Sequence, residues 1–177
     1  MIAENTIKQA SRILKNHNIN SYLIDAEIIL SNIMGVSREF LITNNDINIS
    51  EKLIKKFNNE IKRRIKKEPV AYITGKKEFW KNTFSVNYST LIPRPETELL
   101  IYKIIKLFKY KRINILDIGT GSGCILLSIL RELPLSKGFG IDISKQAIQT
   151  AKKNSKKMNL SNRSNFKAFN INEFNIG

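Results

Sequence analysis

Apolar residues recur at helical spacing in separate stretches of the first seventy residues. The pattern predicts helices over 4–15 and 25–34. A third helix is predicted from an N-cap at Ser50 until Pro69 bars its continuation. Stripes of this kind usually form a core. We therefore predict a small helical bundle over residues 1–70, whose apolar stripes serve packing and not a cofactor.

The hydrophobic period changes in residues 71–90. Residues 74–77 have the composition of a turn, whereas 78–80 and 83–86 resemble short strands on either side of Lys81 and Asn82. The segment is therefore predicted to be a β-hairpin that links two domains.

Strands and helices alternate along residues 91–177. The pattern predicts, in order, a helix over 96–108, a strand over 113–118, a helix over 124–132, a strand over 138–142, a helix over 145–158 and a strand over 165–169. Such alternation is typical of a parallel sheet that binds its ligand at the carboxyl ends of the strands. The predicted fold class is therefore α/β, with a parallel sheet after the helical bundle and the hairpin.

A turn with three glycines follows the first of these strands. Gly119, Gly121 and Gly123 allow a sharp turn and a close approach of a ligand to the main chain. The spacing is not that of the dinucleotide fingerprint, whose third glycine would fall at Cys124. Asp117 just before the turn disfavours a pyrophosphate and suits a cationic ligand or one rich in hydroxyl and amine donors. S-adenosylmethionine is such a ligand.

A second acid, Asp142, ends the next strand about 20 residues beyond the loop, where such folds grip ribose hydroxyls. A glycine-rich turn by itself could be only a tight connection, but the pair of acids favours a cofactor site. Cys124 needs no chemical role, since a small buried residue at the start of a helix is ordinary packing.

Composition limits the class of protein. The chain has one cysteine, so an internal disulfide is impossible and a cysteine-rich metal site is not expected. It has neither a leader-like N-terminus nor about 18 successive apolar residues, which indicates a cytoplasmic protein without a membrane partner. The formal charge of +15 would attract nucleic acid. Because lysines spread along several helices, we favour solvated lysine faces over a dedicated nucleic-acid site.

Residues 91–98 read Leu-Ile-Pro-Arg-Pro-Glu-Thr-Glu. The two prolines hold the backbone extended before a helix, and a rigid charged segment makes a good wall for a site. Alternatively, Arg94 pairs with Glu96 or Glu98 at the surface, where such a pair contributes little stability. Spacing alone does not choose between these interpretations.

Four segments together resemble the bacterial peptide chain release factor glutamine methyltransferases of the HemK/PrmC type. They are residues 68–75 (Glu-Pro-Val-Ala-Tyr-Ile-Thr-Gly), 78–80 (Glu-Phe-Trp), 91–98 and 117–123. The resemblance implies that residues 1–70 form a helical domain that engages a release factor. Residues 91–177 would form the first half of a Rossmann-like domain that binds S-adenosylmethionine. The product would be a methylated glutamine amide in the Gly-Gly-Gln loop of the factor.

The resemblance also implies roles for single residues. The glycine loop would wrap the methionine portion of the cofactor, Asp142 would hold the ribose, and Asn170 would replace the acid that the family places by adenine. Arg94 and Glu96 would shape the wall near the substrate. The expected cofactor residues are Asp117, Gly119, Thr120, Gly121, Ser122, Gly123, Asp142 and Asn170.

The Asn-Pro-Pro-Tyr motif, to which the family's catalytic residues belong, does not occur in these 177 residues. We therefore expect the chain by itself to be an inactive fragment or a truncated product, with an exposed strand edge and an uncovered apolar face. Two other classes remain open: a non-catalytic module that docks a release factor or ribosome, and, less favoured, a nucleic-acid methyltransferase.

Overall fold

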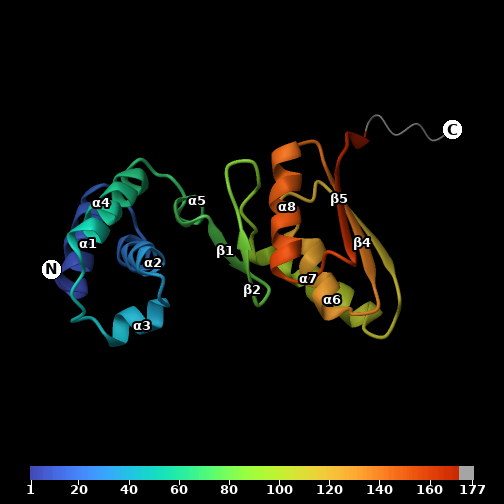
Figure 1. Cartoon of the computed structure of the whole chain (residues 1–177), viewed down its shortest axis with the longest axis horizontal. Coiled ribbons are helices and arrows are strands. Elements are labelled where there is room, and N and C mark those ends of the chain that lie inside the picture. Colours follow the sequence, from blue (N-terminus) through green and yellow to red (C-terminus); the bar gives the residue numbers. More distant parts are fainter. Residues whose placement is uncertain (172–177) are drawn as a thin grey trace. The chain divides into compact units, whose positions relative to one another are not determined.

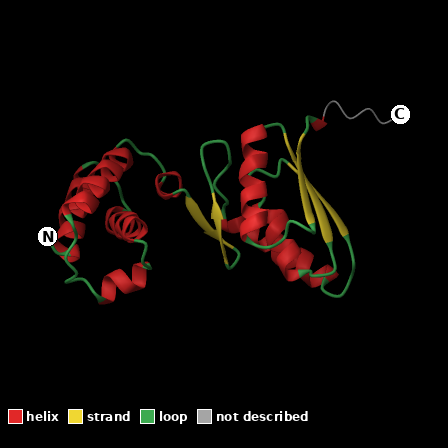
Figure 2. Cartoon of the chain, in the orientation of Figure 1, coloured by secondary structure: helices red, strands yellow, loops and turns green. Residues whose placement is uncertain are grey.

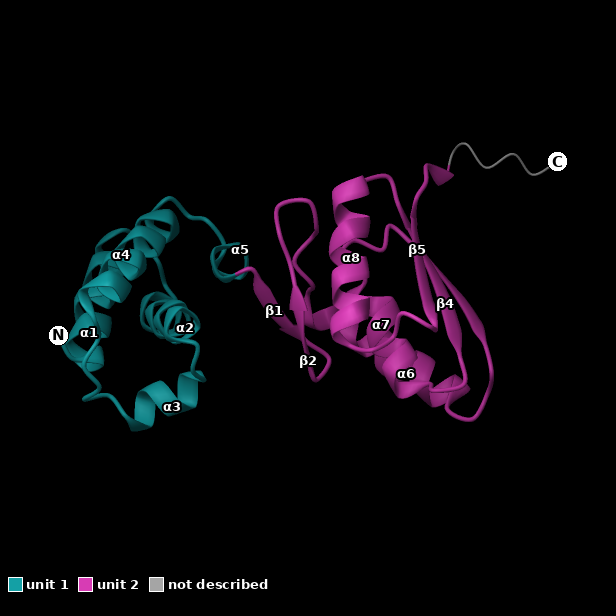
Figure 3. Cartoon of the chain, in the orientation of Figure 1, with its two compact units in different colours: residues 1–74 teal, residues 75–177 magenta. Residues whose placement is uncertain are grey.

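Helices alone form the first of two compact units, Met1–Thr74 (Figures 1 and 3). The computed structural model describes residues 1–171. The first unit contains α1 (Ala3–Asn16), α2 (Tyr22–Met34), α3 (Arg38–Thr43), α4 (Glu51–Ile65) and α5 (Val70–Thr74). The three predicted helices are confirmed, although the third ends three residues before Glu68. Helices α3 and α5 were not predicted.

The predicted apolar stripes form the core of this unit. Leu14, Leu30, Leu41 and Phe57 come from four different helices and are fully buried. Gly35 ends α2 with a φ of 73°, a left-handed conformation that glycine adopts without strain. Ser50 has the extended backbone of an N-cap, but its side chain makes no capping hydrogen bond.

A tight antiparallel hairpin opens the second unit, Gly75–Gly177. Strands β1 (Lys76–Phe79) and β2 (Asn82–Ser85) are joined by Trp80 and Lys81, whose φ angles are 44° and 58°. Two successive positive φ angles match the twist of a two-residue hairpin. The prediction of a hairpin is confirmed, but its turn is one residue earlier than the expected Lys81 and Asn82, because Asn82 pairs with Phe79. The prediction of a turn over 74–77 is wrong in its second half, because Lys76 and Lys77 pair with β2.

After the hairpin, the described part of the second unit consists of a parallel sheet with the strand order β3-β4-β5 and of three α-helices (Figure 2). Its strands are β3 (Asn114–Ile118), β4 (Lys137–Asp142) and β5 (Ser164–Ala168). The helices of the unit are α6 (Glu98–Phe108), preceded by a 3-10 turn over Pro95–Thr97, α7 (Cys124–Glu132) and α8 (Lys145–Lys157). The predicted alternation of strands and helices is therefore confirmed, and α6 starts two residues later than expected.

The helices cover one face of this sheet (Figure 1). Leu126 and Leu130 of α7, Ile148 of α8 and Phe166 of β5 pack together in the core of the unit. Leu116 and Ile118 of β3 are each 57% exposed, so the described residues leave an apolar stripe of the sheet open to solvent. No helix within residues 1–171 is both long and apolar enough to span a bilayer.

Candidate cofactor site

The predicted acids and the glycine loop lie at one edge of the parallel sheet. Asp117 is the fourth residue of β3 and Asp142 is the last residue of β4. In the register of the sheet, Asp117 lies opposite Gly140, and Asp142 lies opposite Ala168 of β5. The carboxyl ends of three parallel strands therefore bring these groups to the edge where such folds bind ligands.

All three glycines of the loop have left-handed backbones, with φ angles of 74°, 55° and 77° at Gly119, Gly121 and Gly123. The backbone N–H groups of Gly119 and Thr120 both donate to the carbonyl oxygen of Ile141 at 2.9 Å. These hydrogen bonds fasten the loop to the end of β4. A Cβ on Gly119 would have no neighbour within 4 Å, so this part of the loop leaves room for a ligand.

Gly123 serves packing. A Cβ there would lie 3.2 Å from side-chain atoms of Ala151 and Leu127 and 3.3 Å from the Phe166 ring. It therefore allows the close approach of helix and strand for which the dinucleotide fingerprint uses its third glycine. In the dinucleotide fingerprint, the third glycine would stand one residue later, at Cys124.

The carboxylate of Asp142 is held by backbone donors on both oxygens. The Gly121 N–H donates to Oδ2 and the Ser144 N–H donates to Oδ1, both at 2.9 Å. A carboxylate oxygen has two lone pairs, so each oxygen can accept a further hydrogen bond from a ligand. The glycine loop and the residue that precedes α8 thus hold this carboxylate through both of its oxygens.

Asp117, near the end of β3, is partly buried. Burial raises the pKa of the Asp117 carboxyl, against a lowering effect of the hydrogen bond that the Thr120 hydroxyl donates to Oδ2 at 2.7 Å. The neighbouring Asp142 charge raises the same pKa further. The ionised form of Asp117 is therefore disfavoured when no cation is close to it.

Cys124 is chemically inert. It is buried, and burial raises the pKa of its thiol to about 11. A thiol with this pKa is almost wholly protonated at neutral pH and is a weak nucleophile. The packing interpretation of Cys124 is confirmed.

Arg94 and Glu96 are exposed, and among the residues described neither forms an ion pair with the other or with Glu98. Glu98 instead accepts a hydrogen bond from the Trp80 N–H at 2.9 Å. The surface-pair interpretation of Arg94 is therefore wrong. Within residues 1–171 no hydrogen bond or ion pair joins the side chain of Arg94 or Glu96 to the glycine loop, and their role in a substrate wall stays a prediction.

Asn170 lies two residues beyond β5 and is half-buried. The preceding residue is fixed by a hydrogen bond from the Phe169 N–H to the carbonyl oxygen of Asp142 at 2.9 Å. Asn170 is therefore at the same edge as the two acids, and its contact with adenine stays a prediction.

Asn154 of α8 connects the hairpin to the glycine loop, which sequence reasoning missed. Its side chain accepts a hydrogen bond from the Ser85 N–H at 2.8 Å. It also donates to the carbonyl oxygens of Ser85 and Ser122, both at 2.9 Å. Only 1% of Asn154 is exposed. The available signal was an asparagine in the helical stripe that contains Ala147 and Ala151, since a buried amide requires hydrogen-bond partners.

The parallel sheet and the helices on it make the second unit an α/β domain of the class that binds ligands at the carboxyl ends of its strands. Comparison with known families agrees with this class. Residues 109–176 match a family described as "Methyltransferase domain". Residues 5–75 match the PrmC N-terminal domain.

Curated relatives make the relationship more specific. The chain is 39% identical to a release factor glutamine methyltransferase of Caulobacter vibrioides over 151 residues, which cover 85% of this chain and 52% of the relative. It is 44% identical to the protein of the same name from Buchnera aphidicola subsp. Schizaphis graminum over 138 residues, covering 78% and 50%. A bifunctional methyltransferase of Rickettsia typhi is 38% identical over 176 residues, covering 89% and 34%.

The chain is therefore similar to bacterial release factor glutamine methyltransferases over 78–85% of its own length, and the resemblance inferred from its motifs is confirmed. It spans about half the length of these release factor methyltransferases. Among solved structures, PKMT2 from Rickettsia typhi in complex with AdoHcy is 31% identical with a TM-score of 0.33, covering 36% of this chain and 12% of that one.

Proposed function

We propose that the second unit binds S-adenosylmethionine at the edge formed by β3, β4 and the glycine loop. The observation that carries this proposal is the Asp142 carboxylate, which Gly121 and Ser144 orient while leaving an acceptor site on each oxygen. Those acceptors suit the two hydroxyls of a ribose. The open side of Gly119 supports a close approach of the ligand to the main chain.

Asp117 supports a cationic ligand over an anionic one. Burial disfavours its charge, so a nearby sulfonium would stabilise the carboxylate and lower its pKa toward the ordinary value. A phosphate would have the opposite effect, because it would add a second negative charge to a poorly solvated site. S-adenosylmethionine carries a sulfonium and a ribose and lacks phosphate.

We further propose that the whole polypeptide methylates the side-chain amide of the glutamine in the Gly-Gly-Gln loop of release factors. The curated relatives' names and the match of the first unit to the PrmC N-terminal domain support this substrate. The first unit would engage the factor. The family's Asn-Pro-Pro-Tyr sequence is not among these 177 residues, so we expect them to bind cofactor without transferring its methyl group. Robust methylation of a release factor by these residues alone would contradict that expectation.

Calorimetric titration of the chain with S-adenosylmethionine tests the cofactor proposal. Asp142→Asn should weaken binding at least about tenfold, because a charge-assisted hydrogen bond contributes roughly 1.5–3 kcal/mol. The introduced amide would also direct its NH2 group at one of the two backbone N–H groups that now donate to Asp142. Asp46→Asn, at an exposed acid of the first unit, is the matched control and should leave affinity unchanged. Equal affinity of all three proteins would contradict the assigned site.

A further inference from the structure

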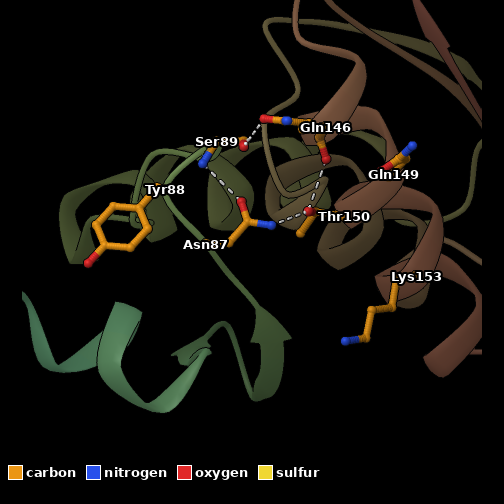
Figure 4. Close-up of a pocket in the computed structure, with 7 residues that line it drawn as sticks. All are labelled: Asn87, Tyr88, Ser89, Gln146, Gln149, Thr150 and Lys153. Carbon is orange, nitrogen blue, oxygen red and sulfur yellow. Dashed lines mark hydrogen bonds between the residues drawn. The ribbon is translucent and has the colours of Figure 1, made fainter. Parts of the chain in front are cut away.

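A polar groove lies outside the candidate cofactor residues, between the loop after β2 and helix α8. It has a volume of about 460 Å³. Figure 4 shows the loop side chains on one side and those of α8 on the other. The lining residues are Asn87, Tyr88, Ser89, Gln146, Gln149, Thr150 and Lys153.

Hydrogen bonds fix the loop side of this groove against the helix. The Asn87 amide donates to the Thr150 hydroxyl at 2.9 Å and accepts from the Ser89 N–H at 2.9 Å. The Ser89 hydroxyl donates to Oε1 of Gln146 at 2.7 Å (Figure 4). The walls are therefore organised before a ligand arrives, which reduces the entropy that binding must overcome.

Helix α8 presents unused donors along the groove. Gln146, Gln149 and Lys153 follow each other at helical spacing, and all three are exposed. The Gln146 NH2 group, the Gln149 amide and the Lys153 ammonium have no hydrogen-bond partner within the described part of the chain. The groove therefore offers donors to a ligand that is rich in acceptors.

Every charged residue of helix α8 is positive. Helix α8 carries Lys145, Lys152, Lys153, Lys156 and Lys157 and no acidic residue. None of the seven lining residues is acidic either. Oriented donors in a positive field favour an anionic ligand and accelerate its arrival.

The donor set fits a peptide better than a nucleic acid. Only one cation lines the groove, whereas a nucleic-acid strand presents a phosphate at every nucleotide and is held mainly by several basic side chains. Side-chain amides both donate and accept, so Gln146 and Gln149 match the carbonyl and N–H groups of an extended main chain. Tyr88, 70% exposed, adds an aromatic surface beside them.

We propose that this groove binds an extended peptide segment that carries an Asp or Glu. The carboxylate lies on Lys153, and the amides of Gln146 and Gln149 hydrogen-bond the flanking main chain. The site needs neither the cofactor nor the methyl-transfer reaction, so it stands or falls independently of the function proposed above.

Fluorescence anisotropy of a labelled peptide, acetyl-(Gly-Glu-Ser)₃-amide, tests this proposal, with acetyl-(Gly-Gln-Ser)₃-amide as the neutral probe. The acidic peptide should bind at least about tenfold more tightly than the neutral one, since a charge-assisted contact is worth roughly twice a neutral one. Lys153→Glu should weaken acidic-peptide binding by about tenfold or more. Lys152→Glu makes the same charge change one residue away, outside the groove, and should weaken it by no more than about threefold.

Three outcomes of these binding measurements would overturn the proposal. The first is an equal loss of binding in the Lys152→Glu and Lys153→Glu variants, which would indicate a diffuse positive surface and not a groove. The second is that the acidic peptide does not bind at all. The third is tighter binding of a ten-nucleotide oligothymidylate than of the peptide, with the same dependence on Lys153. NMR titration gives a readout without mutation: the side-chain amide signals of Gln146 and Gln149 should shift with the acidic peptide. Shifts confined to other residues would equally reject the site.

Discussion

At the scale of single residues, the two carboxylates of the sheet edge differ in what stabilises them. The carboxylate of Asp142 receives two backbone N–H groups, whereas that of Asp117 receives the Thr120 hydroxyl. Burial raises the pKa of Asp117 despite this hydrogen bond. The two acids can therefore act differently on one ligand. Asp142 is a fixed hydrogen-bond acceptor, whereas the carboxylate of Asp117 would be stabilised by a cation.

This difference predicts a pH dependence of stability. The pKa of Asp117 is raised above its usual 3.8 in the folded chain, so the folded state binds more protons than the unfolded state between 3.8 and the raised value. Stability attributable to Asp117 is thus present below that window and falls as the pH rises through it. Asp117→Asn should raise the melting temperature at pH 7 relative to the unchanged chain, because the amide keeps an acceptor for Thr120 without a buried charge.

Differential scanning calorimetry at pH 7 and pH 4 would measure this effect. The advantage of Asp117→Asn should shrink at pH 4, where the native carboxyl gains protons. Asp46→Asn, at an exposed position, controls for the change in net charge. A variant that melts below the unchanged chain at pH 7 would show that the Asp117 charge stabilises the fold.

At the scale of elements, Gly119 and Gly123 share a backbone conformation but differ in surroundings. Both have positive φ angles near 75°, so alanine at either position carries a left-handed penalty of roughly 1–2 kcal/mol. Only Gly123→Ala would also force its Cβ against Ala151, Leu127 and Phe166. Urea unfolding should therefore show a larger loss for Gly123→Ala than for Gly119→Ala. S-adenosylmethionine affinity should fall in Gly119→Ala, whose Cβ would occupy the open side of the loop. Equal unfolding free energies would mean that the helix shifts to make room.

The hydrogen bonds of Asn154 lead to a second prediction at this scale. Asn154→Ala would leave the Ser85 N–H and two carbonyl oxygens without their partner, and each buried unsatisfied group costs about 1–3 kcal/mol. Urea unfolding should show a loss of at least about 2 kcal/mol. Hydrogen exchange at the Ser85 amide should accelerate more than at amides of β4. Asn162→Ala, at an exposed asparagine, is the matched control and should change neither quantity. Unchanged exchange at Ser85 would mean that the hairpin is held by its other contacts, such as the hydrogen bond from Trp80 to Glu98.

Elements with long regular patterns were predictable from the sequence, and short or context-dependent ones were not. Helix α4 has four turns of apolar spacing, whereas α3 has six residues, too few for a period to be recognised. The hairpin turn uses Trp80 and Lys81 with positive φ angles, although turn residues are usually glycine or asparagine. Here the partner strands and the Glu98 carboxylate hold the turn.

The residues of the candidate site also divide into those that local sequence signals predicted and those that they did not. Asp117, Asp142 and the glycines were found because strand ends and glycine spacing are local signals. Asn154 was not, because its partners Ser85 and Ser122 are 69 and 32 residues away in the chain. The groove at Lys153 was also missed, since it forms only when the loop at Ser89 packs on the helix. Spacing could not decide the role of Arg94, and within the described residues its side chain forms no ion pair with Glu96 or Glu98.

At the scale of the whole molecule, each unit has a core of its own and the second has an open apolar stripe. The buried cluster of the first unit lies within residues 3–73, and that of the second lies within 79–166. Leu116 and Ile118 lie on alternate positions of β3, so both side chains point to the same face. Their exposure predicts that the chain self-associates or binds hydrophobic dyes.

The double variant Leu116→Lys with Ile118→Lys should therefore lower the fluorescence of the dye ANS and reduce association in analytical ultracentrifugation. Its unfolding free energy should change little, because more than half of each side chain is already in water. Leu107→Lys, at a 66% exposed residue of α6, is the control for added charge and should leave dye binding close to that of the unchanged chain. Equal effects of the two variants would show that dye binding depends on added surface charge and not on the exposed face of β3. A large loss of stability in the double variant alone would instead show that the β3 side chains are buried in solution, covered by another part of the polypeptide or by a second copy.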